Sequence, residues 1–223
     1  LLPGDGEPRW ILRREVTVAE WRRFVNDPAT LQAIRSGGGF LRVPRSRTEG
    51  VHWIEGPDGR FEPPADWSDT WPVLGISYED AAAYVAWLNA NAERDGAPWR
   101  ASIPTYDEWL AATGAPAVGR WIFGNRWRPK WTSSVFAQPR PTPVPVLSFP
   151  VDESVLGVRD LAGSVSEFVD SWWREDVRHR RRVGQPVAPG LPRDEVPPVE
   201  GIHLDPGKRR SRRRRDPRPD RLC

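Results

Sequence analysis

The chain has 223 residues, enough for one domain of ordinary size, and its formal net charge of +3 is unevenly distributed. Residues 174–223 carry 15 Lys and Arg against 8 Asp and Glu, whereas residues 1–173 carry 18 against 22 and all 13 tryptophans. The basic charge therefore belongs to an Arg- and Pro-rich tail and does not indicate a nucleic-acid-binding body. The single cysteine, Cys223, excludes an internal disulfide and a cysteine-based zinc site.

Three helix starts share one pattern, in which a hydroxyl residue precedes a carboxylate by three positions. In such a capping box the hydroxyl accepts a backbone N–H of the first helical turn, and the carboxylate accepts the N–H of the capping residue. Apolar residues at helical spacing follow each start, which predicts two good helices and one short one. The pairs are Thr17 with Glu20, Ser77 with Asp80, and Thr105 with Glu108.

The predicted strands are short. Residues 51–61 read as a hairpin around a Pro-Asp-Gly turn at 57–59, and the apolar run 72–77 reads as a strand that leads into the second helix. Residues 141–154 alternate apolar residues with prolines, so at best they form an edge strand, because proline cannot donate to a strand ladder. We expect the aromatic cluster of Trp121, Phe123, Trp127 and Trp131 to be core rather than an exposed platform for a peptide or sugar.

Five sequence blocks, in order, carry a resemblance to a known family. They are REVTVAEWRRFVND, PVLGISYEDAAAYVAWLN, SIPTYDEWLAATG, GRWIFGN and FPVDESVLGVRDLAGSVSEFVDSWW. Together they resemble the formylglycine-generating enzyme family, also called the sulfatase-modifying factor domain, and most closely its copies beside bacterial serine/threonine kinase domains. The resemblance implies an α+β, C-type-lectin-like fold with short strands, two to three helices and much ordered loop. We expect this domain in residues 1–173, incomplete at its C-terminal end, and a separate tail in residues 174–223.

The same resemblance implies a calcium site in the turn GVRDLAGSVSEF. In the family, the matching turn wraps a calcium ion, with side-chain ligands at the positions of Asp160 and Glu167 and backbone carbonyls at Gly163 and Val165. Two carboxylates and turn carbonyls within eight residues are the hard oxygen ligands that calcium prefers. The alternative is that both carboxylates cap the turn and face solvent. The family's other calcium site is expected to be lost, with Ser133 at the position of its Asn ligand.

The enzymes of the family bind copper(I) through two cysteines, the soft ligands that this ion selects. Here the corresponding window, residues 198–208, reads PVEGIHLDPGK and contains no cysteine, and Cys223 stands alone in a basic segment. We therefore expect no copper and no oxidase chemistry, which favours a non-catalytic binding or sensory domain, a piece of a larger signalling protein, with an unidentified protein or small-ligand partner. The alternative is a copper-dependent oxidase whose cysteine segment is missing from this sequence.

The tail allows three interpretations. It lacks aromatic residues and cannot bury enough apolar surface to fold, so it is disordered, or it is the product of a frameshift in a GC-rich gene. The third interpretation is a nucleic-acid contact, which we do not favour. Its contact residues would be Lys208, Arg209, Arg210, Arg212, Arg213, Arg214 and Arg215. No apolar run reaches the ~20 residues of a membrane span and no signal peptide is visible, so we expect a cytoplasmic protein without a membrane partner.

Overall fold

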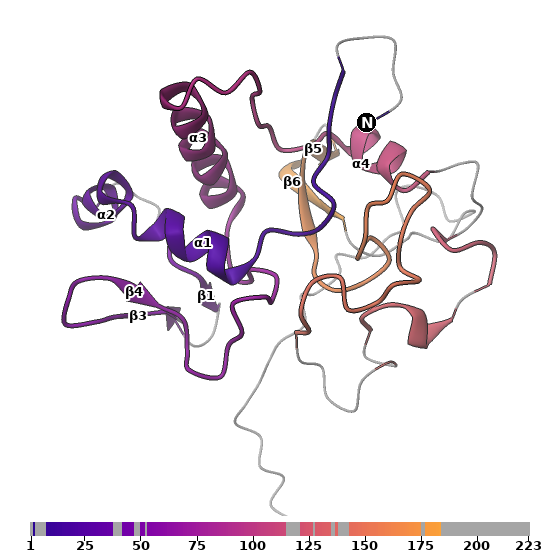
Figure 1. Ribbon diagram of the computed structural model, residues 1–223, viewed down its shortest axis with the longest axis horizontal. Coiled ribbons are helices and arrows are strands. Elements are labelled where there is room, and N and C mark those ends of the chain that lie inside the picture. Colours follow the sequence, from indigo (N-terminus) through magenta and orange to yellow (C-terminus); the bar gives the residue numbers. More distant parts are fainter. Residues whose placement is uncertain are drawn as a thin grey trace, which may run out of the picture.

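The computed structural model describes residues 2, 8–37, 42–46, 50–51, 53–114, 121–126, 128–134, 137, 143–174 and 177–183. Helices and short strands occur together, so the expected α+β class is confirmed. Figure 1 shows two parts side by side, joined by an extended segment that crosses between them near the N-terminus. We call residues 17–95 the helical half, residues 101–183 the loop-rich half, and residues 11–16 the strap.

The three predicted capping boxes are confirmed. In each helix the hydroxyl of the N-cap accepts the N–H of the third helical residue, whose carboxylate accepts the N–H of the N-cap in return. Both exchanges satisfy donors that a helix start leaves free, which explains why the helices begin where they do. The helices are α1 (Val18–Val25), α3 (Tyr78–Arg94) and α4 (Tyr106–Ala112).

A fourth helix, α2 (Pro28–Arg35), was not predicted and adds to the two or three expected. Asp27 caps it by accepting the N–H of Ala29 at 3.0 Å, and proline occupies the first turn, where its missing N–H costs nothing. The Asp27-Pro28 pair is therefore the sequence signal for the start of α2. It is weaker than a capping box, because no carboxylate in the first turn of α2 bonds back to the N-cap.

The predicted hairpin is confirmed as β3 (Ile54–Glu55) paired with β4 (Phe61–Glu62). Its turn ends at Gly59, whose positive φ of 73° suits glycine. A second short pair joins β1 (Arg45–Ser46) to β2 (Gly50–Val51), so Val51 lies outside the hairpin in which it was expected.

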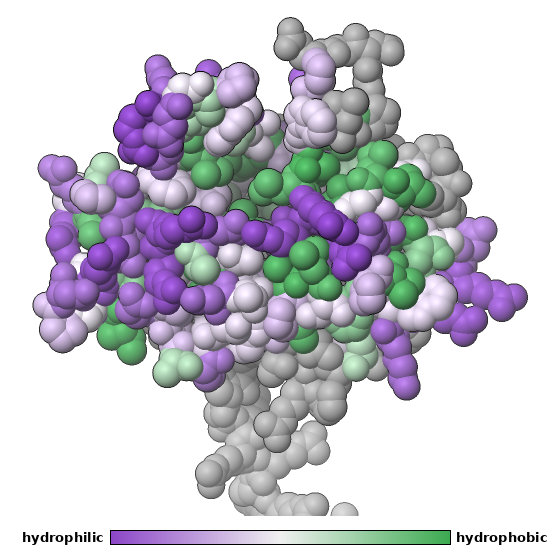
Figure 2. All heavy atoms as spheres, viewed as in Figure 1, coloured by the Kyte–Doolittle hydropathy of each residue, from purple (hydrophilic) through white to green (hydrophobic). Residues whose placement is uncertain are grey.

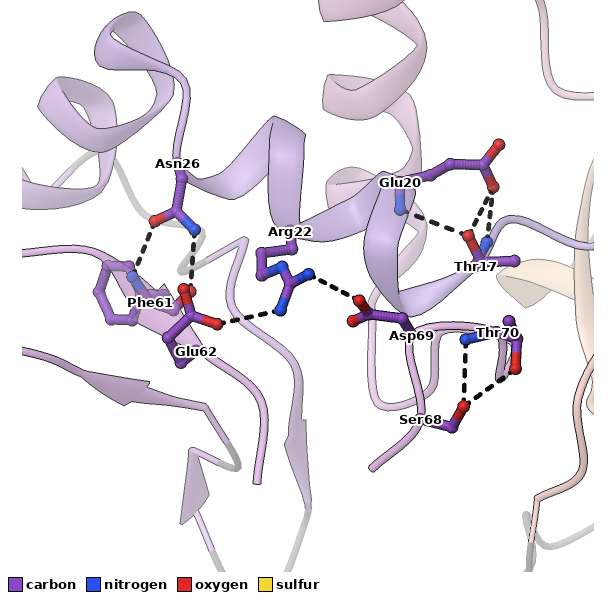
Figure 3. A network of polar contacts seen from close by, with 9 residues as sticks. All are labelled: Thr17, Glu20, Arg22, Asn26, Phe61, Glu62, Ser68, Asp69 and Thr70. Carbon is purple, nitrogen blue, oxygen red and sulfur yellow. Dashed lines mark hydrogen bonds and ion pairs between the residues drawn. The ribbon is translucent and has the colours of Figure 1, made fainter. Parts of the chain in front are cut away.

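Helix α1 holds the β3–β4 hairpin through side chains, as Figure 3 shows. The amide of Asn26 donates to Phe61 O at 2.8 Å and accepts from Phe61 N at 2.7 Å, so it replaces a strand neighbour for that residue. Arg22 joins Glu62 to Asp69 through ion pairs of 3.2 and 2.8 Å. The hairpin is therefore fixed against α1 on one side although each strand has only two residues.

Two predicted strands are wrong. Residues 72–77 form no strand. Pro72 makes an isolated bridge with Thr17, Val73 N bonds to Val16 O at 2.9 Å, and Gly75 O accepts Arg45 N at 2.8 Å. Residues 143–154 form consecutive turns, in which Ser148 N bonds to Pro145 O and Asp152 N to Phe149 O. Proline removes donors from this segment, so no strand ladder forms there. Val146 N and Leu147 N bond outside the segment, to Thr70 O at 2.9 Å and to Asp160 Oδ2 at 2.7 Å.

The helical half has an aromatic core. Trp21 stacks on Tyr84 with ring centroids 5.1 Å apart, and Phe24 meets both rings edge-on at 5.2 and 5.4 Å. Such offset and edge contacts are the arrangements that aromatic rings favour. Trp21 Nε1 also donates to Arg42 O at 2.9 Å, so its polar edge is satisfied. The buried members of this core are Val18, Trp21, Phe24, Val25, Val43, Trp53, Val73 and Tyr84.

The loop-rich half has a smaller core around α4 and β5 (Glu167–Arg174). Its visible face carries gathered hydrophobic residues in Figure 2, whereas the same face of the helical half is mostly hydrophilic. The exposed apolar side chains include Leu12 on the strap and Val155 and Leu156 on the next loop. These two lie just before residues 157–168, which we call the acidic turn. The buried members of this second core are Trp109, Ala112, Ile122, Val158, Leu161, Ala162 and Val169.

Strand β5 pairs antiparallel with β6 (Val177–Val183), with Glu167 opposite Val183. Regular structure therefore continues past Trp173, where the composition places the end of the body. The seven basic residues between Lys208 and Arg215 lie outside the described residues, as do the rest of residues 184–223. Within the described residues, no helix is both long and apolar enough to cross a membrane.

Candidate functional site

The predicted calcium turn places its first carboxylate inside the protein. Asp160 is only 5% exposed, and its Oδ2 accepts the N–H of Leu147 at 2.7 Å. The interpretation in which this side chain faces solvent is therefore wrong. Burial raises the pKa of the Asp160 carboxyl, although the bond from Leu147 opposes the shift.

The second carboxylate belongs to Glu167, the first residue of β5, which is half-buried. Its Oε2 accepts the indole N–H of Trp109 in α4 at 2.7 Å. Burial raises the pKa of Glu167 to about 7, and the charges of Asp160 and Asp152 add to the rise. The indole bond fixes one oxygen and leaves the other able to bind a further group.

Gly163 brings the turn against the preceding loop. Ser164 N donates to Ser133 O at 2.9 Å, and a Cβ added at Gly163 would overlap Thr132 Oγ1 and Ser133 O. Only glycine permits so close an approach of two backbones. Val165, the other expected carbonyl ligand, follows in the same turn and is half-buried.

Backbone strain gathers around this turn. Leu147, Asp160 and Ser164 all have positive φ, at 67°, 63° and 66°, and Arg42 at 54° is the one further described residue other than glycine with this conformation. A left-handed conformation costs an L-residue about 1–2 kcal/mol and persists where surrounding contacts enforce it. Several strained residues in one loop are typical of loops that bind a ligand.

The structure adds Glu15, which the sequence analysis passed over as part of the first helix block. Glu15 is 8% exposed, and neither of its carboxylate oxygens has a hydrogen-bond partner. Burial, together with the negative charges of Glu167 and Asp160, raises the pKa of Glu15 to about 9. Glu15 therefore faces the same acidic region as the predicted ligands. In the sequence, a Glu in the run Glu-Val-Thr before the first helix gave no signal of this role.

Asp152 is a fourth buried acid beside the turn and is fully buried. Its Oδ1 accepts Ala162 N at 3.0 Å, whereas Oδ2 has no partner, nor has the neighbouring Thr132 Oγ1. Burial raises the pKa of Asp152 to about 6, and the charge of Asp160 contributes. Asp152 thus fixes the turn through the bond to Oδ1, and its carboxylate adds negative charge to this region when it is ionised.

Four acids with raised pKa values in one region can hold protons or a hard cation, because either removes their mutual repulsion. The donor set is all oxygen, which fits calcium and does not fit copper(I). Within the described residues, however, no three His, Cys, Asp or Glu side chains stand together as a ready metal site. A cation here would therefore need the carbonyls of Gly163 and Val165 beside the carboxylates.

The structure describes three of the four residues of the predicted aromatic cluster, Trp121, Phe123 and Trp131. Ile122 is buried, and Trp121 stacks on Phe123 with both rings half-buried, in agreement with a core role. Trp131 is 38% exposed and meets Phe123 edge-on at 5.5 Å, so it lies at the rim of that core. Trp127 and Cys223 lie outside the described residues.

Comparison with known proteins agrees with the sequence resemblance. Residues 7–211 match the sulfatase-modifying factor enzyme 1-like domain. The chain is 30% identical over 168 residues to the "Hercynine oxygenase" of Mycolicibacterium thermoresistibile, an alignment that covers 71% of this chain and 34% of that protein. It is 26% identical over 133 residues to the serine/threonine-protein kinase Pkn1 of Chlamydia trachomatis, covering 59% of this chain and 18% of the kinase. The chain therefore spans about a third of the first relative and under a fifth of the second. Because the domain match covers most of its length, this chain belongs to the sulfatase-modifying factor (formylglycine-generating enzyme) family.

Proposed function

We propose that this chain is a non-catalytic binding or sensory domain of its family, and that its acidic turn binds calcium. The observation that carries the proposal is the set of buried carboxylate oxygens without partners at Glu15 and Asp152, beside Asp160 and Glu167. A buried carboxyl without a partner is costly either as a charge or as a protonated group, and a bound cation would offset that cost.

Calcium would be held by the carboxylates of Asp160 and Glu167 and by the carbonyls of Gly163 and Val165. Four such ligands leave room in a shell of about 6–8 oxygens for water and for the carboxylate of Glu15. The ion would supply positive charge and would fix a loop whose backbone is otherwise strained at Ser164. We assign it a structural role that presents the surrounding loops to a partner.

The non-catalytic part of the proposal rests on the sequence. Copper(I) chemistry in this family requires two thiolates, and this chain has the single cysteine Cys223. The match to a kinase supports a place beside a signalling domain, with a protein or small ligand as the partner. For the tail beyond β6, residues 184–223, we keep the interpretation of a disordered or frameshifted segment, and we favour a nucleic-acid role for it least.

An enzyme is the second candidate, and the match to a hercynine oxygenase is the observation that favours it. The matched region covers 34% of that relative, so the relative's activity belongs to a chain about three times as long as the matched part. The source gene separates the two candidates. Translated in all three frames from the codon of Trp173 onward, it should encode no cysteine pair, whereas a neighbouring frame that encodes two cysteines after an Arg-Gly-Gly-Ser-Trp segment would favour an oxidase.

Calcium binding is tested with the full chain by isothermal titration and by melting curves. Calcium at 100 times its Kd should stabilise the folded state by ~2.7 kcal/mol if it binds only that state. Asp160→Asn and Glu167→Gln should each weaken binding at least tenfold. The matched controls Asp66→Asn and Glu79→Gln change exposed acids of the helical half and should bind calcium normally. Binding that is absent, or that both site variants retain, contradicts the proposal.

A further inference from the structure

Positive charge in the body of the chain gathers in one segment. Residues 109–151 contain five Lys and Arg and no Asp or Glu, whereas the rest of residues 1–173 carries 13 Lys and Arg against 22 Asp and Glu. The described basic residues of this segment are Arg126, Arg128 and Lys130, and all three are exposed. A local excess of one charge in a body of the opposite charge indicates a surface for a ligand of complementary charge.

These three cations are not neutralised by acids of the described part of the chain. Arginines elsewhere in the body pair with carboxylates, as Arg159 does with Glu153. The ion pairs among the described residues include none with Arg126, Arg128 or Lys130. Their positive charge therefore faces solvent and is available to a partner.

Aromatic rings lie beside these cations. Trp131 ends the short helix η1 (Pro129–Trp131) and is 38% exposed. It meets Phe123 edge-on at 5.5 Å, and Phe123 stacks on Trp121 at 6.3 Å. The Arg128 guanidinium lies 5.8 Å from the centre of the Trp131 ring, within the range of a cation–π contact. Positive charge and an exposed ring are thus presented together.

The segment that carries these side chains is fixed at both of its ends. Trp121 N and Gly124 N each donate to the other residue's carbonyl oxygen at 2.9 Å, and Thr132, directly after η1, is fully buried. Figure 1 shows residues 121–134 on the side of the loop-rich half that lies away from the helical half. Contact groups that are already held in place lose less conformational entropy when they bind.

We propose that this surface binds an acidic segment of a partner protein. Trp and Arg are the residue types that carry most of the affinity at protein interfaces, and unpaired cations favour a partner rich in Asp and Glu. The inference rests on the proposed binding function and gives the chemistry of its partner, but it does not require calcium. The surface, which we call the basic-aromatic surface, consists of Trp121, Phe123, Arg126, Arg128, Lys130 and Trp131.

The charge of the whole body favours a short protein segment over a nucleic acid. A nucleic acid carries one phosphate charge per nucleotide, so a long strand would also meet the net negative charge of the rest of the body. A short acidic segment can place its carboxylates against Arg126 and Lys130 alone. An apolar or aromatic side chain of the same segment would then cover the exposed ring of Trp131.

Fluorescence anisotropy of the full chain with labelled peptides tests the inference. The probe is a twelve-residue peptide of Asp and Glu with two central tryptophans, labelled with fluorescein and titrated in a metal chelator. It should bind about tenfold more tightly than the matched peptide of Asn and Gln, and raising the salt from about 0.05 M to about 0.5 M should remove that difference. No binding up to about 1 mM chain, or equal binding of the two peptides at low salt, would overturn the inference.

Single substitutions place the peptide on the surface. Trp131→Ala should weaken its binding about tenfold, and Arg126→Gln and Lys130→Gln about two- to fivefold each. Trp99→Ala and Arg100→Gln, at exposed residues outside the surface, are the matched controls and should bind as wild type does. Because Arg126 and Lys130 are exposed, their substitution does not threaten folding. Binding that all three surface variants retain would contradict the proposal.

The basic tail and an oligonucleotide supply the last comparisons. A full-chain variant with glutamine at the seven basic positions between 208 and 215 should bind the peptide within about twofold of wild type, because distant sites act independently. Loss of binding in that variant would assign the peptide to the tail and overturn the inference. A strand of twelve thymidines that binds this tail variant more tightly than the peptide does, and that Trp131→Ala releases, would assign the surface to nucleic acid instead.

This inference and the calcium proposal fail in different ways. Peptide binding that persists in a chain without measurable calcium binding would remove the calcium site and leave the basic-aromatic surface. Calcium binding in a chain that does not bind the peptide would remove this inference and leave the acidic turn.

Discussion

The two halves of this molecule are stabilised by different means. The helical half rests on rings packed against helices, with Trp21, Phe24 and Tyr84 in mutual contact. The loop-rich half has short regular elements and relies on close backbone contacts, strained residues and buried acids around Asp160. Packing of apolar rings depends little on pH or ions, whereas the second arrangement depends on the charge that its acids carry. A change of pH or of cation should therefore be felt first in the loop-rich half.

The largest effect is expected in the aromatic core. Phe24 is 2% exposed, so Phe24→Ala should lower the free energy of unfolding by about 3–5 kcal/mol, through lost apolar burial and the cavity left behind. Urea unfolding followed by near-ultraviolet circular dichroism measures this loss. Leu12→Ala, at a residue 65% exposed, is the control and should change stability by less than ~0.5 kcal/mol. Equal losses in the two variants would contradict the assignment of the core.

The close approach at Gly163 gives the next effect. Gly163→Ala should destabilise by about 3 kcal/mol, because its Cβ would meet Thr132 Oγ1 and Ser133 O. Gly96→Ala is the control, since nothing lies near its Cβ and only its positive φ of 67° opposes the change, at about 1 kcal/mol. Urea unfolding compares the two, and a Gly163→Ala loss no greater than that of the control would show that the turn can move away.

The buried acids predict an unusual pH dependence. The raised pKa values of Glu15 and Glu167, to about 9 and about 7, mean that the folded chain binds more protons than the unfolded chain above the unfolded pKa of 4.5. Stability should therefore fall as pH rises from 7 to 8 in a metal chelator, by about 2 kcal/mol. Calcium should reduce this fall. Stability in chelator that rises over this range would contradict the buried cluster.

The smallest effect concerns the strained backbone at Ser164, whose φ is 66°. Asparagine tolerates this conformation better than serine, so Ser164→Asn should stabilise by about 0.5 kcal/mol. Ser166→Asn, at an exposed residue of the same turn whose φ is not positive, should have no effect. Thermal melts in chelator compare the variants, and a destabilised Ser164→Asn would show that the serine hydroxyl matters more than the strain.

The helical half could largely be predicted from the sequence, because a capping box followed by an apolar stripe is a local signal. Thr17 with Glu20 and Ser77 with Asp80 show this directly. The candidate site could be predicted only in part. Asp160 and Glu167 were found through family resemblance, whereas Glu15 reaches them from a distant part of the chain. Its role depends on the path of the strap, which no local pattern encodes.

In the strap, Ile11 packs against the core of the loop-rich half, whereas Arg14 pairs with Glu20 and Val16 packs against the aromatic core. This alternation limits how the length of the strap can change. One residue inserted or deleted between Ile11 and Val16 would exchange the two sides, presenting Arg14 to the acidic turn and Glu15 to Glu20. The turn of the β3–β4 hairpin is less constrained, because Pro57 and Asp58 are exposed, although Arg35 donates to Gly59 O at 2.7 Å. Among relatives of this chain, length variation should therefore accumulate at that turn and be absent from the strap.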